Sequence, residues 1–379
     1  MVWRMLALGV AVGRVILVDE ATGEVKWAVQ AHPAGGTWRS SVVMSPDGKF
    51  VASVGFDDER WKIWDAASGA LRRAGPTHDG TGECVCGVPE LGQRLVLEGC
   101  PVAAHTRGIR AVACSGSRLA TGGLDGAIIL WDAETGEAER RLLERSTEIS
   151  SVTFTADGAR LASGSVNALY GSGSRVRIWD VTTGTLLRTI QETRDSVLGV
   201  HFSPQNSRRL AVAGSGELIH VWDVDMSTSV PPPRSGAIMS TMNGSRFAVF
   251  SPDGRTIATV GYPFSRDANL FDVETGTLRF SMVGHTSPLS SASFSIDDGS
   301  KLATGSHDGT CKVWDSSTGE LLRTIILGTS VGSVAWGRDW VRDTQRGEAF
   351  AMGHHPRLGV GSRLLELEVG VVRMILDRV

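Results

Sequence analysis

The chain has 379 residues and a formal net charge of -3 at pH 7, with Lys and Arg spread along its length. This balance argues against a nucleic-acid partner, since a dedicated binder usually carries a basic domain or stripe, and no apolar run approaches the length that spans a membrane. The five Cys residues are odd in number and have no framework spacing, which favours a reducing compartment, so we expect the cytoplasm and leave the nucleus open.

The N-terminal stretch predicts two strands, Met5–Val10 and Val15–Val18, which end at Asp19. With Arg4 before an apolar run, the same residues also have the pattern of a weak signal peptide. The strand interpretation is preferred because Asp19 opens the first copy of a turn that recurs along the chain.

That turn marks a repeated unit. An Asp follows each predicted third strand at intervals of 43 to 49 residues, with one interval of 67, and Trp precedes it in five copies. In six of the seven copies a Thr-Gly or Ser-Gly turn follows. A unit of four short strands has too little core to stand alone, so the units are expected to stack. The Asp residues are Asp19, Asp65, Asp132, Asp180, Asp223, Asp272 and Asp315.

The clearest copy runs from Gly284 to Ile325, begins with Gly-His and has Trp314-Asp315 after its third strand. The Gly-His start, the Trp-Asp end and the period resemble the WD-repeat family, whose fold is a β-propeller. The resemblance covers roughly residues 4–337. It implies an all-β, seven-bladed β-propeller over residues 1–337, with strands a, b, c and d of each blade running from the central channel outward.

The first and last strands are expected to share a blade. The N-terminus supplies strands b, c and d of blade 1 but no strand a, whereas strand 331–336 has no Trp-Asp after it. Completing blade 1 with 331–336 removes the open edges of an unclosed ring. The alternative is eight blades, with 348–353, 363–368 and 371–377 as further strands.

Three segments depart from the repeat. An insertion at about 76–100 predicts an extra hairpin from Glu83–Val88 and Arg94–Leu97. Three prolines at 231–233 cannot join a ladder, so the outer strand of blade 5 should be short or absent. In the tail, 338–379, helix formers at Val341–Met352 and a later apolar stripe predict two short helices packed on the propeller, although the second also has alternation that suits a strand. The stripe is Leu364, Leu367, Val371 and Ile375.

The resemblance also implies a structural hydrogen-bonded tetrad in three blades, made of a His before strand a, a Ser or Thr in strand b, an Asp in the b–c turn and the Trp of strand c. Such a set recurs in several blades, whereas a catalytic site needs one preorganised pocket, so we expect no enzyme activity. Blade 4 lacks the His and has Asn167 at the Asp position, and blades 5 and 6 match only in part. The expected tetrads are His32, Ser53, Asp57 and Trp64; His105, Thr121, Asp125 and Trp131; and His285, Thr304, Asp308 and Trp314.

Cys84 and Cys86, with Cys100, His78 and His105 nearby in sequence, could be drawn as a zinc site. The C-x2-C pairing usual for zinc is missing, so packed thiols are preferred. Neither a metal nor a cofactor is expected.

The d–a and b–c loops of such propellers commonly bind partners on one face. Both Tyr residues of the chain fall on lengthened b–c loops, and aromatic and Arg side chains are typical of interface cores. An alternative for Phe56 and Leu124 is that they fill space between blades. The candidate partner-binding residues are Trp38, Arg39, Phe56, Arg110, Leu124, Tyr170, Tyr262, Phe264, Arg266 and His307.

The leading interpretation is a monomeric, non-catalytic scaffold that binds a protein or peptide on this face within a larger complex. One alternative is a substrate-recognition adaptor of a ubiquitin ligase or another multiprotein complex. Ligase receptors of this family often carry an Arg two residues after the Trp-Asp aspartate, but Ala67, Glu134, Thr182, Asp225 and Ser317 stand there. An enzyme site in the channel is the weakest alternative, since His201 is the one ionisable residue in the core of the predicted inner strands.

Overall fold

The computed structural model describes residues 4–33, 41–55, 57–75, 77–78, 84–88, 93–97, 105–143, 148–166, 174–191, 196–215, 218–225, 238–240, 245–261 and 265–338. The chain divides into one unit of Met1–Trp340 and another of Val341–Val379. All described residues belong to the first unit. The expected helices of the tail, and the extra strands of the eight-blade alternative, therefore lie outside the described residues.

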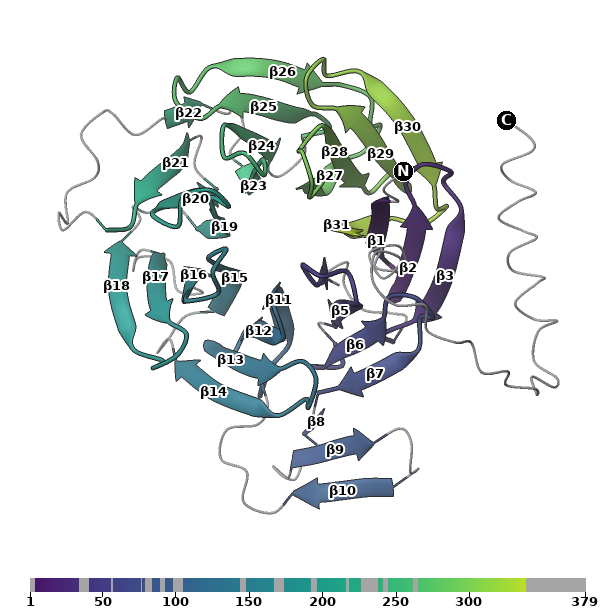
Figure 1. Cartoon of the computed structure of the whole chain (residues 1–379), viewed down its shortest axis with the longest axis vertical. Coiled ribbons are helices and arrows are strands. Elements are labelled where there is room, and N and C mark those ends of the chain that lie inside the picture. Colours follow the sequence, from purple (N-terminus) through teal and green to yellow (C-terminus); the bar gives the residue numbers. More distant parts are fainter. Residues whose placement is uncertain are drawn as a thin grey trace, which may run out of the picture. The chain divides into compact units, whose positions relative to one another are not determined.

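Seven four-stranded antiparallel sheets stand around a central axis, which confirms the predicted all-β, seven-bladed propeller (Figure 1). Each sheet is a blade, and its innermost strand is strand a. Blades 1 to 4 are, from the axis outward, β31 (Val331–Arg338), β1 (Arg4–Val10), β2 (Arg14–Asp19) and β3 (Val25–Gln30); β4 (Ser41–Met44), β5 (Phe50–Val54), β6 (Trp61–Asp65) and β7 (Leu71–Ala74); β11 (Ile109–Ser115), β12 (Arg118–Gly123), β13 (Ala127–Asp132) and β14 (Ala138–Leu143); and β15 (Glu148–Phe154), β16 (Arg160–Val166), β17 (Arg175–Asp180) and β18 (Leu186–Gln191).

The remaining three blades have the same order. They are β19 (Val197–Phe202), β20 (Arg209–Gly214), β21 (Leu218–Asp223) and β22 (Ile238–Ser240); β23 (Ser245–Phe250), β24 (Thr256–Gly261), β25 (Ala268–Asp272) and β26 (Leu278–Met282); and β27 (Leu289–Phe294), β28 (Lys301–Ser306), β29 (Thr310–Asp315) and β30 (Leu321–Ile326).

Blade 1 joins the two ends of the ring. β31 pairs antiparallel with β1, and Trp336 lies opposite Leu6 and Val334 opposite Leu8. Because β1 would otherwise be an open inner edge, this pairing satisfies the backbone groups of both strands.

The recurring turn between strands c and d has a local physical cause. In blade 3, Asp132 Oδ1 accepts the backbone N–H groups of Glu134 at 2.9 Å and Thr135 at 2.7 Å. Gly136 then adopts a φ of 80°, and its N–H donates to the Asp132 carbonyl at 2.8 Å. Asp caps the turn and Gly supplies the left-handed backbone, so the sequence pattern is a requirement of the turn itself.

The core is divided into layers between neighbouring blades. Blades 2 and 3 share one cluster, in which the rings of Trp61 and Trp131 lie 5.1 Å apart. Strands alternate side chains between their two faces, and both faces of an inner blade strand meet another blade. The burial pattern of β5 and β13 is therefore continuous rather than alternating.

The insertion forms a separate three-stranded sheet outside the ring, made of β8 (Thr77–His78), β9 (Cys84–Val88) and β10 (Gln93–Leu97) (Figure 1). In blade 5, the outer strand β22 has three residues and pairs only with Leu218, Ile219 and His220 of β21. The proline run at 231–233 lies outside the described residues.

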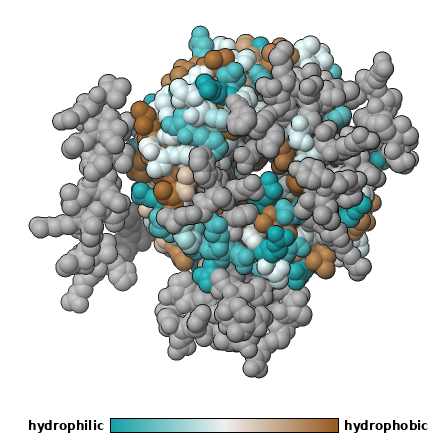
Figure 2. Space-filling model, turned by 180° about the vertical axis from the view of Figure 1, so that it is seen from behind, coloured by the Kyte–Doolittle hydropathy of each residue, from teal (hydrophilic) through white to brown (hydrophobic). Residues whose placement is uncertain are grey.

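The described outer surface carries scattered apolar side chains. Leu186 and Leu187 on β18, and Leu321 and Leu322 on β30, are exposed. Seen from one side, hydrophobic side chains appear as separate spots between polar ones (Figure 2). Isolated apolar residues of this kind are normal on a protein surface.

Candidate functional site: the loop face and the central channel

In blades 3 and 7 the predicted tetrad residues are joined by hydrogen bonds. His105 Nε2 lies 2.8 Å from Thr121 Oγ1, and its Nδ1 lies 3.0 Å from Asp125 Oδ1. Trp131 Nε1 donates to the same threonine oxygen at 2.8 Å. In blade 7 the corresponding distances are 2.9 Å from His285 to Thr304, 2.8 Å from His285 to Asp308 and 2.8 Å from Trp314 to Thr304.

These contacts define the direction of each hydrogen bond. The ionised Asp308 can only accept, so Nδ1 of the neutral His285 imidazole carries the proton and donates to it. Nε2 is then an acceptor, and Thr304 Oγ1, which accepts from the Trp314 indole, donates its hydrogen to Nε2. Because Thr304 is fully buried, no substrate can reach its hydroxyl group. The set fastens strand b, strand c and two loops together.

In blade 2 the carboxylate partner is Asp58, and the prediction of Asp57 is wrong. His32 Nδ1 lies 2.8 Å from Asp58 Oδ2, His32 Nε2 lies 3.0 Å from Ser53 Oγ, and Trp64 Nε1 donates to Ser53 at 3.0 Å. Asp57 is exposed. The turn after Ser53 is one residue longer than its counterparts, and Glu59 takes a positive φ of 55° within it.

Counting back from the Trp of strand c along the sequence identifies Asp58 as the tetrad carboxylate. The tetrad carboxylate precedes its Trp by six positions at Asp125 and at Asp308, and Asp58 stands six positions before Trp64. Counting forward from Ser53 fails because the turn length varies, whereas the hairpin from the carboxylate to the Trp does not.

The electrostatics of blade 7 agree with this arrangement. Burial opposes ionisation of Asp308, but hydrogen bonds from Thr310, His285 and the backbone N–H of Thr286 lower its pKa to about 2. Burial lowers the pKa of His285, and Asp308 offsets this effect only in part. A neutral imidazole beside an ionised carboxylate is therefore the resting state at neutral pH.

Blades 4 and 6 retain only fragments of the tetrad. In blade 4, Trp179 Nε1 donates to Ser163 at 3.0 Å, while Asn167 lies outside the described residues. In blade 6, Phe271 replaces the Trp, and Thr259 Oγ1 is buried with no hydrogen-bond partner among the described residues. A buried hydroxyl left unpaired costs about 1–3 kcal/mol of stability, so Thr259 lowers the stability of blade 6.

Six of the ten candidate partner-binding residues lie outside the described residues. They are Trp38, Arg39, Phe56, Tyr170, Tyr262 and Phe264. The other four are described, and the structure places them on three blades rather than in one cluster.

Two of these four take part in contacts between loops. His307 Nδ1 lies 2.7 Å from Ser330 Oγ, which connects the b–c turn of blade 7 to the loop before β31. The Leu124 N–H donates to the Gly108 carbonyl at 3.0 Å, and the Leu124 side chain is half-buried. Arg110 is half-buried on β11, and Arg266 is exposed in the b–c loop of blade 6. Arg266 is therefore the most accessible of the four.

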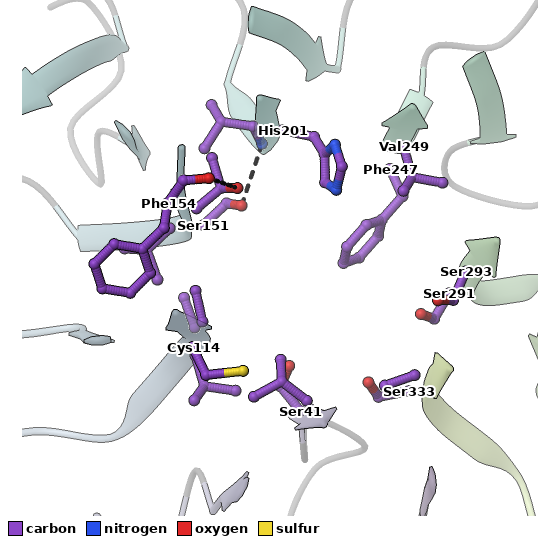
Figure 3. Close-up of a pocket in the computed structure, with 18 of the residues that line it drawn as sticks. Ser41, Cys114, Ser151, Phe154, His201, Phe247, Val249, Ser291, Ser293 and Ser333 are labelled. Atoms are coloured by element: carbon purple, nitrogen blue, oxygen red, sulfur yellow. Dashed lines mark hydrogen bonds between the residues drawn. The ribbon is translucent and has the colours of Figure 1, made fainter. Parts of the chain in front are cut away.

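The inner strands enclose a cavity of about 480 Å³. Ser41, Ser151, Ser291, Ser293 and Ser333 surround it together with Phe154, Phe247 and Val249 (Figure 3). The sequence did not predict this polar lining, because in the sequence the inner strands show only that they are rich in small residues.

Several of these serines join neighbouring blades. Ser151 Oγ accepts the Val200 N–H at 3.2 Å, and Ser291 and Ser293 accept the N–H groups of Val334 and Trp336, both at 3.3 Å. Each strand a is the edge of its sheet, so its channel-side N–H groups need acceptors from outside the sheet. Serine is small enough to supply them without filling the channel.

His201 is one of the side chains that line this cavity (Figure 3). The Phe250 N–H donates to His201 Nδ1 at 3.4 Å. Although part of the ring reaches the cavity, burial lowers the pKa of His201 to about 4, and a hydrogen bond with the Phe202 backbone acts weakly in the other direction. The imidazole is therefore neutral at physiological pH.

Within the described ranges, no three His, Cys, Asp or Glu side chains are grouped as metal ligands would be. Burial raises the pKa of the thiols of Cys114 and Cys311 to about 12, so both stay protonated. No helix in the described part is long and apolar enough to cross a membrane.

The family signature described as WD domain, G-beta repeat, matches residues 24–65, 99–132, 139–180 and 276–315. Each matched segment ends at the Asp that terminates a strand c, namely Asp65, Asp132, Asp180 and Asp315. Three of the matched segments begin near or within the outer strand of one blade, at β3, β14 and β26, and end in the next blade, whereas the segment that begins at residue 99 starts after the insertion that follows β7.

Several curated proteins are similar to parts of the chain. Protein tipD of Dictyostelium discoideum is 31% identical over 125 residues, which are 32% of this chain and 18% of that protein. Autophagy-related protein 16 of Arabidopsis thaliana is 26% identical over 226 residues, 59% of this chain and 41% of that protein. Target of rapamycin complex subunit wat1 of Schizosaccharomyces pombe is 32% identical over 124 residues, 31% of this chain and 35% of that protein. The chain spans less than half the length of each of these relatives.

Proposed function

The chain is a WD-repeat β-propeller, and from this premise we propose that it is a non-catalytic scaffold that binds a protein or peptide segment on the face formed by its b–c and d–a loops. A general role in protein interaction fits the relatives, one of which is named as a subunit of the target of rapamycin complex and another as a component of COMPASS.

The observation that carries the proposal is that the tetrad residues of this face are engaged in hydrogen bonds with one another. In blades 2, 3 and 7 the imidazole, hydroxyl and carboxylate groups bond one another and are buried or half-buried. They hold the described parts of the loops in place, and within these three tetrads each of these groups is already engaged in a structural hydrogen bond. A surface supported in this way is suited to binding, because less conformational entropy is lost when a partner docks.

The docking surface comprises the lengthened b–c loops and their neighbours, including Tyr170, Tyr262 and the exposed Arg266. Arg and Tyr residues are often the anchors of protein interfaces. The tetrads below these loops act only as positioning residues.

A pull-down from a lysate of the source cells, followed by mass spectrometry, tests the surface. The double variant Tyr170→Ala/Tyr262→Ala is compared with wild type and with Leu187→Ala/Leu322→Ala, a matched loss of exposed apolar side chains on the outer strands. Circular dichroism checks that all three proteins are folded. We expect a partner that is lost from the loop variant and kept by the outer-strand variant. An identical set of partners for all three proteins would refute the loop face.

A further inference from the structure

The residue after the tetrad histidine differs between blade 2 and the other two complete tetrads. In blade 3 the N–H of Thr106 donates to Asp125 Oδ2, and in blade 7 the N–H of Thr286 donates to Asp308 Oδ2, both at 3.0 Å. Pro33 stands at this position in blade 2, and proline has no backbone N–H to donate. The carboxylate of blade 2 therefore lacks a donor that its two counterparts have.

A basic side chain lies beside the carboxylate of blade 2. Lys62 Nζ is 3.8 Å from Asp58 Oδ2, the oxygen that also bonds His32 Nδ1 at 2.8 Å. The distance to Lys62 is that of an ion pair rather than of a hydrogen bond. Lys62 Nζ also donates to the carbonyl of Ala31, which directly precedes His32. The ammonium group thus links the b–c turn of blade 2 to the loop before its strand a.

This ion pair is shielded from solvent, since the side chains of Lys62 and Asp58 are 18% and 13% exposed. Burial opposes ionisation of Asp58, but His32 and Lys62 outweigh it and lower the pKa of this carboxyl below its ordinary value. Burial also lowers the pKa of Lys62, Asp58 raises it, and the charge of Arg60 on the same turn lowers it. Opposite Lys62, β7 carries the uncharged Ala74. Each charge of the pair is therefore stabilised by the other.

The other two tetrads show that such a cation is optional where the backbone N–H is present. Lys312 of blade 7, like Lys62, stands two positions before the Trp of strand c. Its ammonium group donates to Thr324 Oγ1 on strand d at 3.0 Å. In blade 3, Arg141 of strand d lies 3.6 Å from Asp125 Oδ2, in addition to the N–H already described. Only blade 2 combines a basic neighbour of the carboxylate with a proline after the histidine.

We infer that Lys62 is a positioning residue of the loop face, which gives the tetrad carboxylate of blade 2 the positive partner that Pro33 cannot provide. Lys62 acts through Asp58 and the Ala31 carbonyl, and it holds the loop before β4 against the b–c turn. The use of these loops in docking rests on the proposed function, whereas the effect of Lys62 on the loops does not. A partner lost or kept in the pull-down therefore leaves this role unchanged, and the reverse also holds.

A double-mutant cycle tests whether Lys62 replaces the missing donor. Lys62→Met keeps the apolar stem and removes the charge, and Pro33→Thr restores the N–H at an exposed position. In urea unfolding, Lys62→Met should raise the unfolding equilibrium constant at least about tenfold in the wild-type background, because it leaves Asp58 largely buried without its cation. In the Pro33→Thr background this factor should be at least about fivefold smaller.

Lys312→Met is the matched control for the loss of a lysine at the same strand position. It should change the unfolding constant by less than about threefold. If Lys62→Met does not fold, Lys62→Gln takes its place in the cycle. Equal factors in the two backgrounds, or a loss in the control as large as that at Lys62, would overturn the inference.

The pH dependence separates lost charge from lost packing. Because the folded pKa of Asp58 lies below its ordinary value of 3.8, its ionised form contributes stability above pH 3.8 that is lost as the pH falls through the folded pKa. Lys62→Met raises the folded pKa. The ratio of unfolding constants between the variant and wild type should therefore shrink as the pH is lowered from 7 to about 3. A constant ratio would mean that only packing is lost and would contradict the inference.

Hydrogen exchange measures the loop directly. The N–H groups of Ala31 and His32 donate to the Gly13 carbonyl at 2.9 and 2.8 Å. In Lys62→Met both should exchange at least about fivefold faster, relative to the N–H of Thr286 in blade 7, because the loop before β4 opens locally. Unchanged relative rates at Ala31 and His32 would show that Lys62 does not hold this loop.

Discussion

The indole of Trp27 in blade 1 covers Gly69 in the turn between strands c and d of blade 2. Trp27 Nε1 donates to the Ala66 carbonyl at 2.8 Å, and a Cβ added at Gly69 would lie 2.8 Å from Trp27 Cγ. Gly69 also has a φ of 71°. The glycine of the repeated turn is thus required twice, by its own backbone and by the side chain of the neighbouring blade.

Gly69→Ala should therefore destabilise the protein through both effects. Gly116→Ala is the matched control, because Gly116 has a φ of 57° and nothing within 4 Å of the added Cβ. We expect the control to lose about 1–2 kcal/mol of unfolding free energy through backbone strain. Gly69→Ala should lose about 1–3 kcal/mol more, because the added methyl group displaces the indole. Urea unfolding followed by circular dichroism measures both. Equal losses of unfolding free energy in the two variants would show that the Trp27 indole moves aside at no energetic cost.

The threonine of the tetrad should matter only where its partners exist. Thr304→Val removes the partner of both Trp314 Nε1 and His285 Nε2, and each orphaned group costs about 1–3 kcal/mol. Thr259→Val changes the equivalent position of blade 6, whose hydroxyl has no partner among the described residues, so it should be neutral or stabilising. The free energies of unfolding of the two variants test this contrast. A loss at Thr259 as large as that at Thr304 would contradict it.

The sequence predicted most of this pattern, and its failures have local causes. The residues at His105, Thr121, Asp125 and Trp131 were identified by position, because hairpins of fixed length place them. Asp57 was chosen over Asp58 because the b–c turn of blade 2 has an extra residue. The role of Ser151 and Ser291 could not be predicted, since the residues that face them belong to the next blade and lie more than 40 positions away in the chain.

His201 should make stability depend on pH. Its pKa is about 4 in the folded chain against 6.5 for an ordinary histidine, so the unfolded state binds a proton first as the pH falls. The contribution is fully present above pH 6.5, is lost progressively down to about 4, and amounts to about 3 kcal/mol. Unfolding free energies measured across this range should fall less steeply for His201→Gln than for wild type.

One buried serine hydroxyl should contribute measurably to the closure of the ring. Ser290 Oγ lies 3.0 Å from the Gly305 carbonyl within blade 7 and 2.6 Å from the Val331 carbonyl at the start of β31. Ser290 is buried, so Ser290→Ala leaves the Val331 carbonyl without this donor, at a cost of about 1–3 kcal/mol. Ser150→Ala removes the same pair of contacts between blades 4 and 5, from Ser150 Oγ to Gly164 at 2.9 Å and to Val197 at 2.7 Å.

The two variants should lose similar stability, but they should differ in hydrogen exchange. Both contacts lie where the chain runs on from one blade into the next inner strand, but only β31 is also paired with a strand from the other end of the described chain, β1. Only Ser290→Ala should therefore accelerate exchange along both β31 and β1. If Ser150→Ala accelerated exchange of β1 equally, the junction at β31 would not be the point where the ring opens.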